Sequence, residues 1–161
     1  MSIFTSSGTK FYISSTSTAP ATYDATGYAA LTYTQVNFVE DMGAFGDTAT
    51  DVTFDDIGDR RTKTLKGQFK GEQLSLVCGY DDADAGQMLL ITSNADTTQV
   101  DWHFKIELPN KQATAGDNAI AYFSGRVMSS KRTISTANNV VKLESTIQPN
   151  TAIVYVASTA I

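Results

Sequence analysis

The chain has 161 residues, of which 42% are apolar and 18% charged, and its formal net charge at pH 7 is −5. The chain has a single cysteine, Cys78, so an internal disulfide scaffold is excluded. It also has a single histidine, His103, and one cysteine with one histidine cannot supply the ligands of an ordinary Cys/His zinc site. The acidic balance argues against general attraction to nucleic acid or anionic membranes, and no apolar run reaches the ~18–20 residues that cross a bilayer. We expect one soluble domain of a reduced compartment over residues 1–161.

Two strands are predicted in the first quarter of the chain, at Lys10–Ser15 and Thr32–Val39, because both segments are rich in β-branched and aromatic residues. The stretch between Val39 and Thr62 then contains three glycines and no convincing strand. Irregular segments of ~20 residues are uncommon in compact domains and are usually functional or disordered. We therefore predict an extended arm at about residues 40–61.

The charges in and after this arm are sorted by sign. Every charged residue from Glu40 to Asp59 is acidic, and the next five charged residues are basic. The acidic candidates for assembly, with the apolar residues between them, are Asp41, Phe45, Asp47, Asp51, Phe54, Asp55, Asp56, Ile57 and Asp59. The basic candidates form a partner strip of Arg60, Arg61, Lys63, Lys66 and Lys70. In a strand at Lys63–Phe69, Leu65 and Phe69 are expected on the face opposite to that of Lys66 and Lys70.

After a further strand at Gln73–Gly79, one short helix is predicted from about Ala83 to Ser93. Carboxylates precede it, Asp82 is a suitable N-cap, and apolar residues follow at helical spacing. The same carboxylates resemble the start of a calcium loop, but Ser93 stands where a bidentate glutamate is needed. Helix capping is the simpler interpretation.

The last third of the chain predicts four more strands. Thr98–Leu108 alternates strictly, which places Trp102 and Phe104 on a buried face and His103 on a wet one. The others are Asn118–Ser129, apolar on both sides, then Asn139–Ile147 and Thr151–Ala157. The predicted fold is mainly β (α+β): an antiparallel β-sandwich or barrel with one short flanking helix and a long extended loop.

No catalytic, cofactor or metal site is predicted. A nucleophile–histidine pair would require His103, which we expect on a sheet surface, and Cys78 alternates with Leu74 and Leu76 as a buried residue. Asp55, Asp56 and Asp59 lack supporting ligands for a cation. The chain has no phosphate- or dinucleotide-binding glycine motif. These observations indicate a protein that is not an enzyme and needs no cofactor.

Interaction between the two charged segments is a better hypothesis. If the acidic arm reached the basic strip of its own chain, the contact would only rearrange a surface. If it reached the strip of a neighbouring copy, the contact would be head-to-tail, and such contacts close into rings or propagate as filaments. The apolar residues Phe45, Val52, Phe54 and Ile57 support this, because each contributes roughly 1.5–3 kcal/mol when buried on a partner.

The order of these elements resembles the tail tube proteins of long-tailed bacteriophages, and the similarity covers nearly the whole chain. It is carried by Gly8-Thr9-Lys10-Phe11-Tyr12-Ile13-Ser14, Val36-Asn37-Phe38-Val39, the Gly/Asp arm, Lys63-Thr64-Leu65-Lys66-Gly67, Leu74 and Leu76, Asp84–Leu90, Phe123–Met128 and Val140–Ile147.

The resemblance implies a structural virion protein that forms hexameric rings stacked into a tube, a fold shared with type VI secretion tubes. It implies that the tube houses a tape-measure protein, contacts other tail proteins and conducts DNA into the host, that Glu40–Arg61 is the stacking arm, and that the subunit is made in the bacterial cytoplasm. An alternative is a monomeric β-sandwich that binds carbohydrate or cells, with Tyr12, Tyr23, Tyr28 and Tyr33 as a sugar-stacking face.

Overall fold

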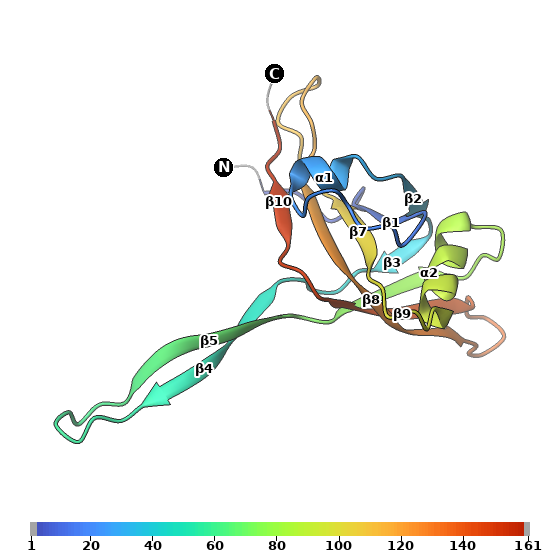
Figure 1. The fold of residues 1–161 in the computed structure, drawn as a ribbon. Helices are drawn as coiled ribbons and strands as arrows, with labels where there is room; N and C mark the ends of the chain where they lie inside the picture. Colours follow the sequence, from blue (N-terminus) through green and yellow to red (C-terminus); the bar gives the residue numbers. More distant parts are fainter. Residues whose placement is uncertain (1–2, 160–161) are drawn as a thin grey trace.

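A computed structural model describes residues 3–159, which form ten strands and two helices (Figure 1). In chain order these are β1 (Lys10–Ser14), α1 (Ala25–Ala29), β2 (Tyr33–Val36), β3 (Val39–Asp41), β4 (Asp47–Phe54), β5 (Lys63–Gly71), β6 (Leu74–Gly79), α2 (Ala85–Ala95), β7 (Trp102–Glu107), β8 (Ile120–Thr133), β9 (Lys142–Pro149) and β10 (Val154–Val156).

Eight strands form one antiparallel sheet in the order β2-β1-β7-β8-β9-β6-β3, with β10 paired to β8. The expected antiparallel β class is confirmed. The sheet is not a closed barrel, because its end strands β2 and β3 do not pair with each other. They are nevertheless consecutive in the chain, so the sheet curls until its two ends meet near Phe38. That residue has a φ of +59°, and this turn splits the single strand expected at Thr32–Val39 into two.

The core lies on the face of the sheet that α2 covers. Phe104 stacks on Phe123 with ring centroids 5.2 Å apart, and Phe11 lies 5.8 Å from Phe104. Leu90 reaches this layer from α2 and is fully buried. Each such side chain contributes roughly 1.5–3 kcal/mol of transfer free energy, so burial of this layer stabilises the body.

The helices differ from the expectation in number and position. α2 begins two residues later than predicted, and its N-cap is Asp84, whose carboxylate accepts a hydrogen bond from the Gln87 amide at 3.0 Å. α1 was not predicted, since five residues are too few for a periodic signal. Asp24 caps it by accepting from the Gly27 amide at 2.8 Å. The fold therefore has two short helices, not one.

The second face of β7 is also covered, which makes the expectation of a surface histidine wrong. Tyr28 of α1 packs edge-on against the His103 ring at 6.2 Å and stacks on Tyr122 at 5.6 Å. His103 is consequently only 1% exposed. Alternation in β7 separates its two faces but does not reveal that α1 returns to cover the second one.

Candidate assembly surfaces

The most prominent feature of the molecule is the hairpin of β4 and β5, which projects from the body as a separate two-stranded sheet (Figure 1). We name residues 47–71 the arm. The expectation that no strand lies between Val39 and Thr62 is wrong, because Asp47–Phe54 is strand β4. Threonine, valine and phenylalanine favour a strand here, and the interspersed aspartates concealed the pattern.

The acidic strand pairs with the basic strand of its own chain. Asp51 lies opposite Lys66, and Phe54 lies opposite Lys63. The arm contains five acidic and five basic residues, leaving seven basic and twelve acidic residues elsewhere, so the rest of the chain holds the whole net charge of −5. The hairpin of residues 47–71 is therefore neutral overall, whereas the predicted segment 40–61 by itself is acidic.

A β-bulge fixes which side chains share a face of the arm. Between the pairs Ala49–Phe69 and Asp51–Lys66, one residue of β4 lies opposite two of β5. A Cβ at Gly67 would come within 2.5 Å of the Thr50 Oγ1, so the bulge requires glycine there. The extra residue shifts the alternation, and Leu65 and Phe69 lie on opposite faces, contrary to expectation.

One face of the arm is therefore apolar. Val52 lies opposite Leu65, and Phe54 follows two residues later on the same face. We call Val52, Phe54 and Leu65 the apolar face. These side chains are 48%, 59% and 60% exposed, respectively, and Ile57 at the tip is fully exposed. A two-stranded hairpin with such a face is marginal alone and gains stability when another surface covers it.

The predicted residues at positions 41–45 belong to the body and not to the projecting arm. Phe45 is partly buried against the core and stacks on Tyr155 at 6.5 Å. Asp41 accepts a hydrogen bond from the Gly43 amide at 3.0 Å. At the tip, Asp56 accepts from the Gly58 amide at 2.9 Å, and Asp59 forms an exposed ion pair with Lys63 at 3.5 Å.

The remaining predicted charges, at Asp47, Asp51, Asp55, Asp56, Arg60, Arg61, Lys66 and Lys70, form no ion pair within residues 3–159. The acidic residues thus lie on β4 and the tip of the hairpin, and the basic residues on the tip and β5. The structure brings the two predicted charged segments together in one chain, and their contact with a neighbouring copy stays a prediction.

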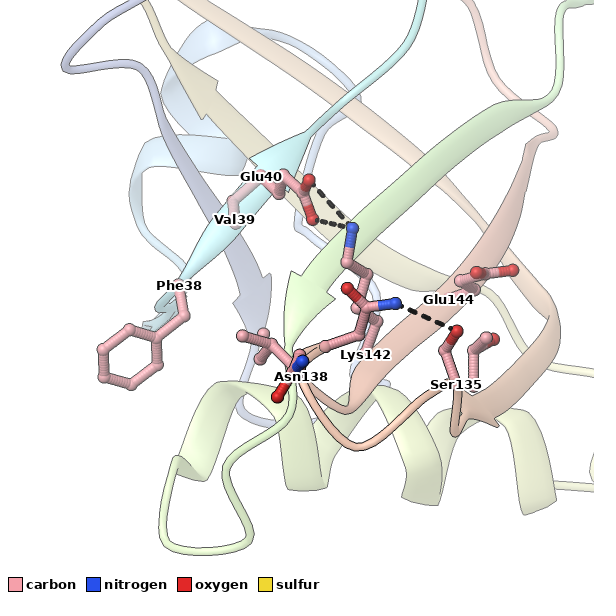
Figure 2. A pocket seen from close by; sticks show the side chains of 11 residues that line it. Phe38, Val39, Glu40, Ser135, Asn138, Lys142 and Glu144 are labelled. Atoms are coloured by element: carbon pink, nitrogen blue, oxygen red, sulfur yellow. Dashed lines mark hydrogen bonds and ion pairs between the residues drawn. The ribbon is translucent and has the colours of Figure 1, made fainter.

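Sequence reasoning missed a groove of about 770 Å³ between β3 and the turn that joins β8 to β9 (Figure 2). Phe38, Val140 and Glu144 line it, and Lys142 pairs with Glu40 across it at 2.7 Å. Phe38 is 64% exposed at its rim. The left-handed backbone that presents this ring leaves no signal in the sequence. We call this site the Phe38 groove.

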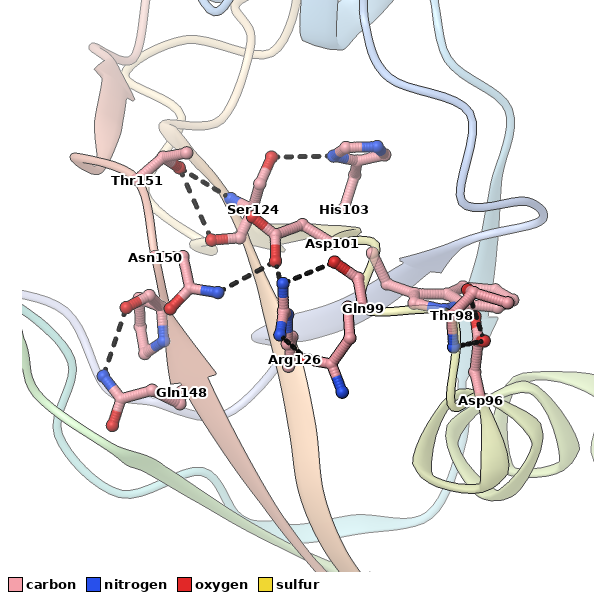
Figure 3. Close-up of polar contacts among 12 residues, drawn as sticks. Asp96, Thr98, Gln99, Asp101, His103, Ser124, Arg126, Gln148, Asn150 and Thr151 are labelled. Atoms are coloured by element: carbon pink, nitrogen blue, oxygen red, sulfur yellow. Dashed lines mark hydrogen bonds and ion pairs between the residues drawn. The ribbon is translucent and has the colours of Figure 1, made fainter.

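A second polar cluster lies inside the body (Figure 3). His103 Nδ1 and Ser124 Oγ are 2.7 Å apart, and the Tyr28 hydroxyl lies 2.8 Å from the same Ser124 Oγ. Burial lowers the pKa of His103 below its ordinary value. Ser124 is fully buried, and its contact with Tyr28 joins α1 to the sheet.

Among residues 3–159, no group of three or more His, Cys, Asp or Glu side chains is arranged to hold a metal ion. Cys78 is buried, and burial raises the pKa of its thiol to about 12. Neither helix in the described part of the chain is long and apolar enough to span a membrane.

No family model and no curated protein matches the sequence, and the comparison that finds relatives is with solved structures. The fold of this chain is similar to that of chains from phage tails and contractile injection systems, which confirms the expected resemblance.

One such relative is a chain of the sheath/tube terminator of an extracellular contractile injection system, PVC (TM-score 0.70, 13% identity, 98% of this chain and 99% of that chain). Another is a chain of the sixfold-symmetrised anti-feeding prophage baseplate (TM-score 0.68, 12% identity, 98% of both chains). A third is the SPP1 tail tube (TM-score 0.59, 12% identity, 92% and 76%).

Proposed function

We propose that this chain is a structural subunit of a tail tube, in which hexameric rings stack through the arm. The observation that carries the proposal is the projecting hairpin with an exposed apolar face on a body whose whole length has the tube fold. An apolar projection of this kind is unfavourable on a monomer and is stabilised by burial on a neighbour.

Open sheet edges support ring formation. The outer edge of β3 and the outer edge of β10 are unpaired within the described residues, and Tyr155 on β10 is exposed. Unpaired edges are sites where another chain can extend the sheet, and closure around a ring removes them. The anti-feeding prophage relative comes from a sixfold-symmetrised assembly, which favours six subunits for the ring.

The charge distribution fits a conduit. A ring of six copies would carry a net charge of about −30, because each chain carries −5. An acidic lumen repels phosphates, whereas each Lys or Arg contact with phosphate would add affinity and slow the passage of DNA. We infer that the subunit is made in the host cytoplasm and resides in the tail of a virion. There the tube surrounds a tape-measure protein, contacts other tail proteins and allows transient passage of DNA. The subunit acts without catalysis or a cofactor.

The alternative, a monomeric carbohydrate- or cell-binding module, has less support. Tyr28 of the proposed sugar-stacking face is fully buried against Tyr122, and Lys105 lies over the Tyr12 ring at 4.1 Å. Only Tyr23 of the four tyrosines is largely exposed, so no continuous stacking platform remains.

Negative-stain electron microscopy combined with light scattering on the purified chain tests the proposal. We expect rings or tubes that form with increasing concentration. The matched control replaces residues 47–71 with a short Gly-Ser linker and is expected to keep a folded body without tubes. If the chain instead stays a 17.3 kDa monomer at every concentration and binds a glycan, the result supports the alternative.

A further inference from the structure

Two exposed apolar surfaces lie at opposite ends of β6. The arm leads into the start of this strand, and Gly79 at its end lines the Phe38 groove. Figure 1 shows the arm leaving one side of the body and the β8–β9 turn lying on the other. When one such surface of a copy binds the other surface of the next copy, the contact is head-to-tail and can repeat from copy to copy.

Phe38 is unusual in both conformation and exposure. Its φ of +59° lies in the left-handed region, which is disfavoured for a bulky side chain. The Gly79 amide donates to the Phe38 carbonyl at 2.8 Å, and the Asn37 amide donates to Asp84 at 3.2 Å, so the neighbouring backbone is held on both sides. This arrangement stores strain while presenting an aromatic ring to solvent, which is a feature of binding surfaces.

The groove beside this ring has room for side chains of the arm tip. A Cβ at Gly79 would lie 3.6 Å from the Phe38 Cβ and 4.0 Å from Val140 Cγ1, so these two apolar side chains flank a floor without a side chain. Its volume of about 770 Å³ is in the range of pockets that accept several side-chain-sized groups. β4 has eight residues and spans about 27 Å, which carries Phe54 and Ile57 well beyond the body of their own chain.

Charge also fits this pairing. Arg60 and Arg61 at the tip form no ion pair within residues 3–159, and the same holds for Glu144 in the groove. Glu40 and Lys142 neutralise each other at the groove, which leaves Glu144 as the free charge there. Contact between these arginines and the Glu144 carboxylate would fix the orientation of the apolar tip in the groove.

We propose that the arm tip of one copy, from Phe54 to Arg61, docks in the Phe38 groove of a second copy. This inference rests on the tube function proposed above and names the surface that receives the arm. It predicts that Ile57 of one chain lies beside Val140 of the next.

Disulfide trapping between two single-site variants tests the pairing directly. Chains with Ile57→Cys are mixed with chains with Val140→Cys under mild oxidation, and the native Cys78 stays out of the reaction because it is buried. We expect a covalent heterodimer in assembled tubes. Met128→Cys is the control partner, because Met128 is well exposed but does not line the groove, and it should give no heterodimer.

The outcomes of this experiment separate the two proposals. Tubes without the Ile57–Val140 heterodimer would overturn the docking inference and leave the tube function intact. A chain that forms no rings or tubes at all would overturn both.

A second test uses Phe38→Asn, because asparagine adopts the left-handed conformation more readily than phenylalanine. We expect the urea unfolding midpoint to stay unchanged or to rise. The protein concentration needed for tube assembly should rise about tenfold or more, because the variant lacks the ring that the proposed contact buries. Wild-type assembly would contradict the proposal. Loss of assembly with an equal loss of stability would contradict it as well, because it would give Phe38 a packing role within its own chain.

Discussion

Asp84 holds Asn37 with both of its carboxylate oxygens: Oδ1 accepts from the Asn37 side-chain amide at 2.6 Å, and Oδ2 accepts from the Asn37 backbone amide at 3.2 Å. Oδ2 also accepts from the Gln87 amide in the first turn of α2. One buried side chain thereby joins the start of a helix to the point where the chain passes from one end of the sheet to the other.

Replacement of Asp84 by alanine should therefore destabilise the fold strongly. The change removes the helix cap, leaves the buried Gln87 amide without its acceptor and releases Asn37, so we expect a loss of roughly 2–4 kcal/mol in the free energy of unfolding by urea. Asp82→Ala is the control, because Asp82 is exposed and its loss should change stability by less than about 0.5 kcal/mol. Equal losses in the two variants would show that Asp84 does not act as described.

Stability should fall with pH below neutrality through His103. Burial lowers its folded-state pKa below the ordinary value of 6.5, so the unfolded chain binds the proton more readily. The contribution is fully present above the unfolded pKa and is lost as pH falls below it, with a slope of at most ~1.4 kcal/mol per pH unit. Urea unfolding at pH 7.5, 6.5 and 5.5 measures it.

The chain contains no other histidine, so His103→Gln should flatten the dependence between pH 5.5 and 7.5. The carboxyl of Glu107, whose pKa is lowered by its hydrogen bond from Asn118, titrates at lower pH and does not interfere. A slope that persists unchanged in His103→Gln would contradict this assignment.

The close contact of α2 with β2 should make Gly86 irreplaceable. A Cβ at this position would lie 2.2 Å from the Gln35 carbonyl oxygen and 2.7 Å from Val36 Cα, so backbone must move. Although alanine favours a helix over glycine by about 1 kcal/mol, we expect Gly86→Ala to lower the thermal stability by roughly 1–3 kcal/mol. Ala85→Gly, next in the helix and exposed, should cost only about 1 kcal/mol. A stabilised Gly86→Ala variant would refute the close approach.

Charge reversal at the arm tip should impair assembly and spare the fold. Asp55 and Asp56 are exposed and form no ion pair within the described part of the chain, so lysine at both positions should leave the urea unfolding midpoint unchanged. Tube formation should decrease severalfold, because among residues 3–159 Glu144 is the one groove carboxylate without an ion pair, and the added positive charges of the tip would be buried without a partner. The variant Asp82→Lys/Asp117→Lys makes the same change in net charge away from the arm. Equal tube lengths in the two variants would contradict a charge role for the tip.

The arm should become protected only on assembly. It has no core of its own, so its amides are expected to exchange with deuterium within seconds in the free subunit and at least a hundredfold more slowly in tubes. Amides of β7, central in the sheet, serve as the internal reference and should be protected in both states. If the arm amides are already protected in the monomer, the arm does not become ordered by contact with a neighbouring copy.

The β class, most of the body strands and the presence of a segment excluded from the core could all be predicted from the amino-acid sequence. Alternation in Trp102–Glu107 and the sorted charges of residues 40–70 are local patterns, and a local pattern can be recognised without knowledge of the tertiary structure. The sequence also indicated that Phe54 and Ile57 would lack shelter in their own chain, because acidic neighbours and glycines surround them.

The sequence patterns did not reveal which segments pack against one another. His103 is buried because α1, distant in sequence, covers the second face of β7, and the acidic segment is neutralised because it pairs with the basic strand of its own chain. The Gly67 bulge moves Leu65 and Phe69 to opposite faces, and the left-handed Phe38 forms the rim of a groove. These outcomes depend on contacts between distant segments and on single backbone conformations, whose energies are not encoded in the periodicity of any one strand.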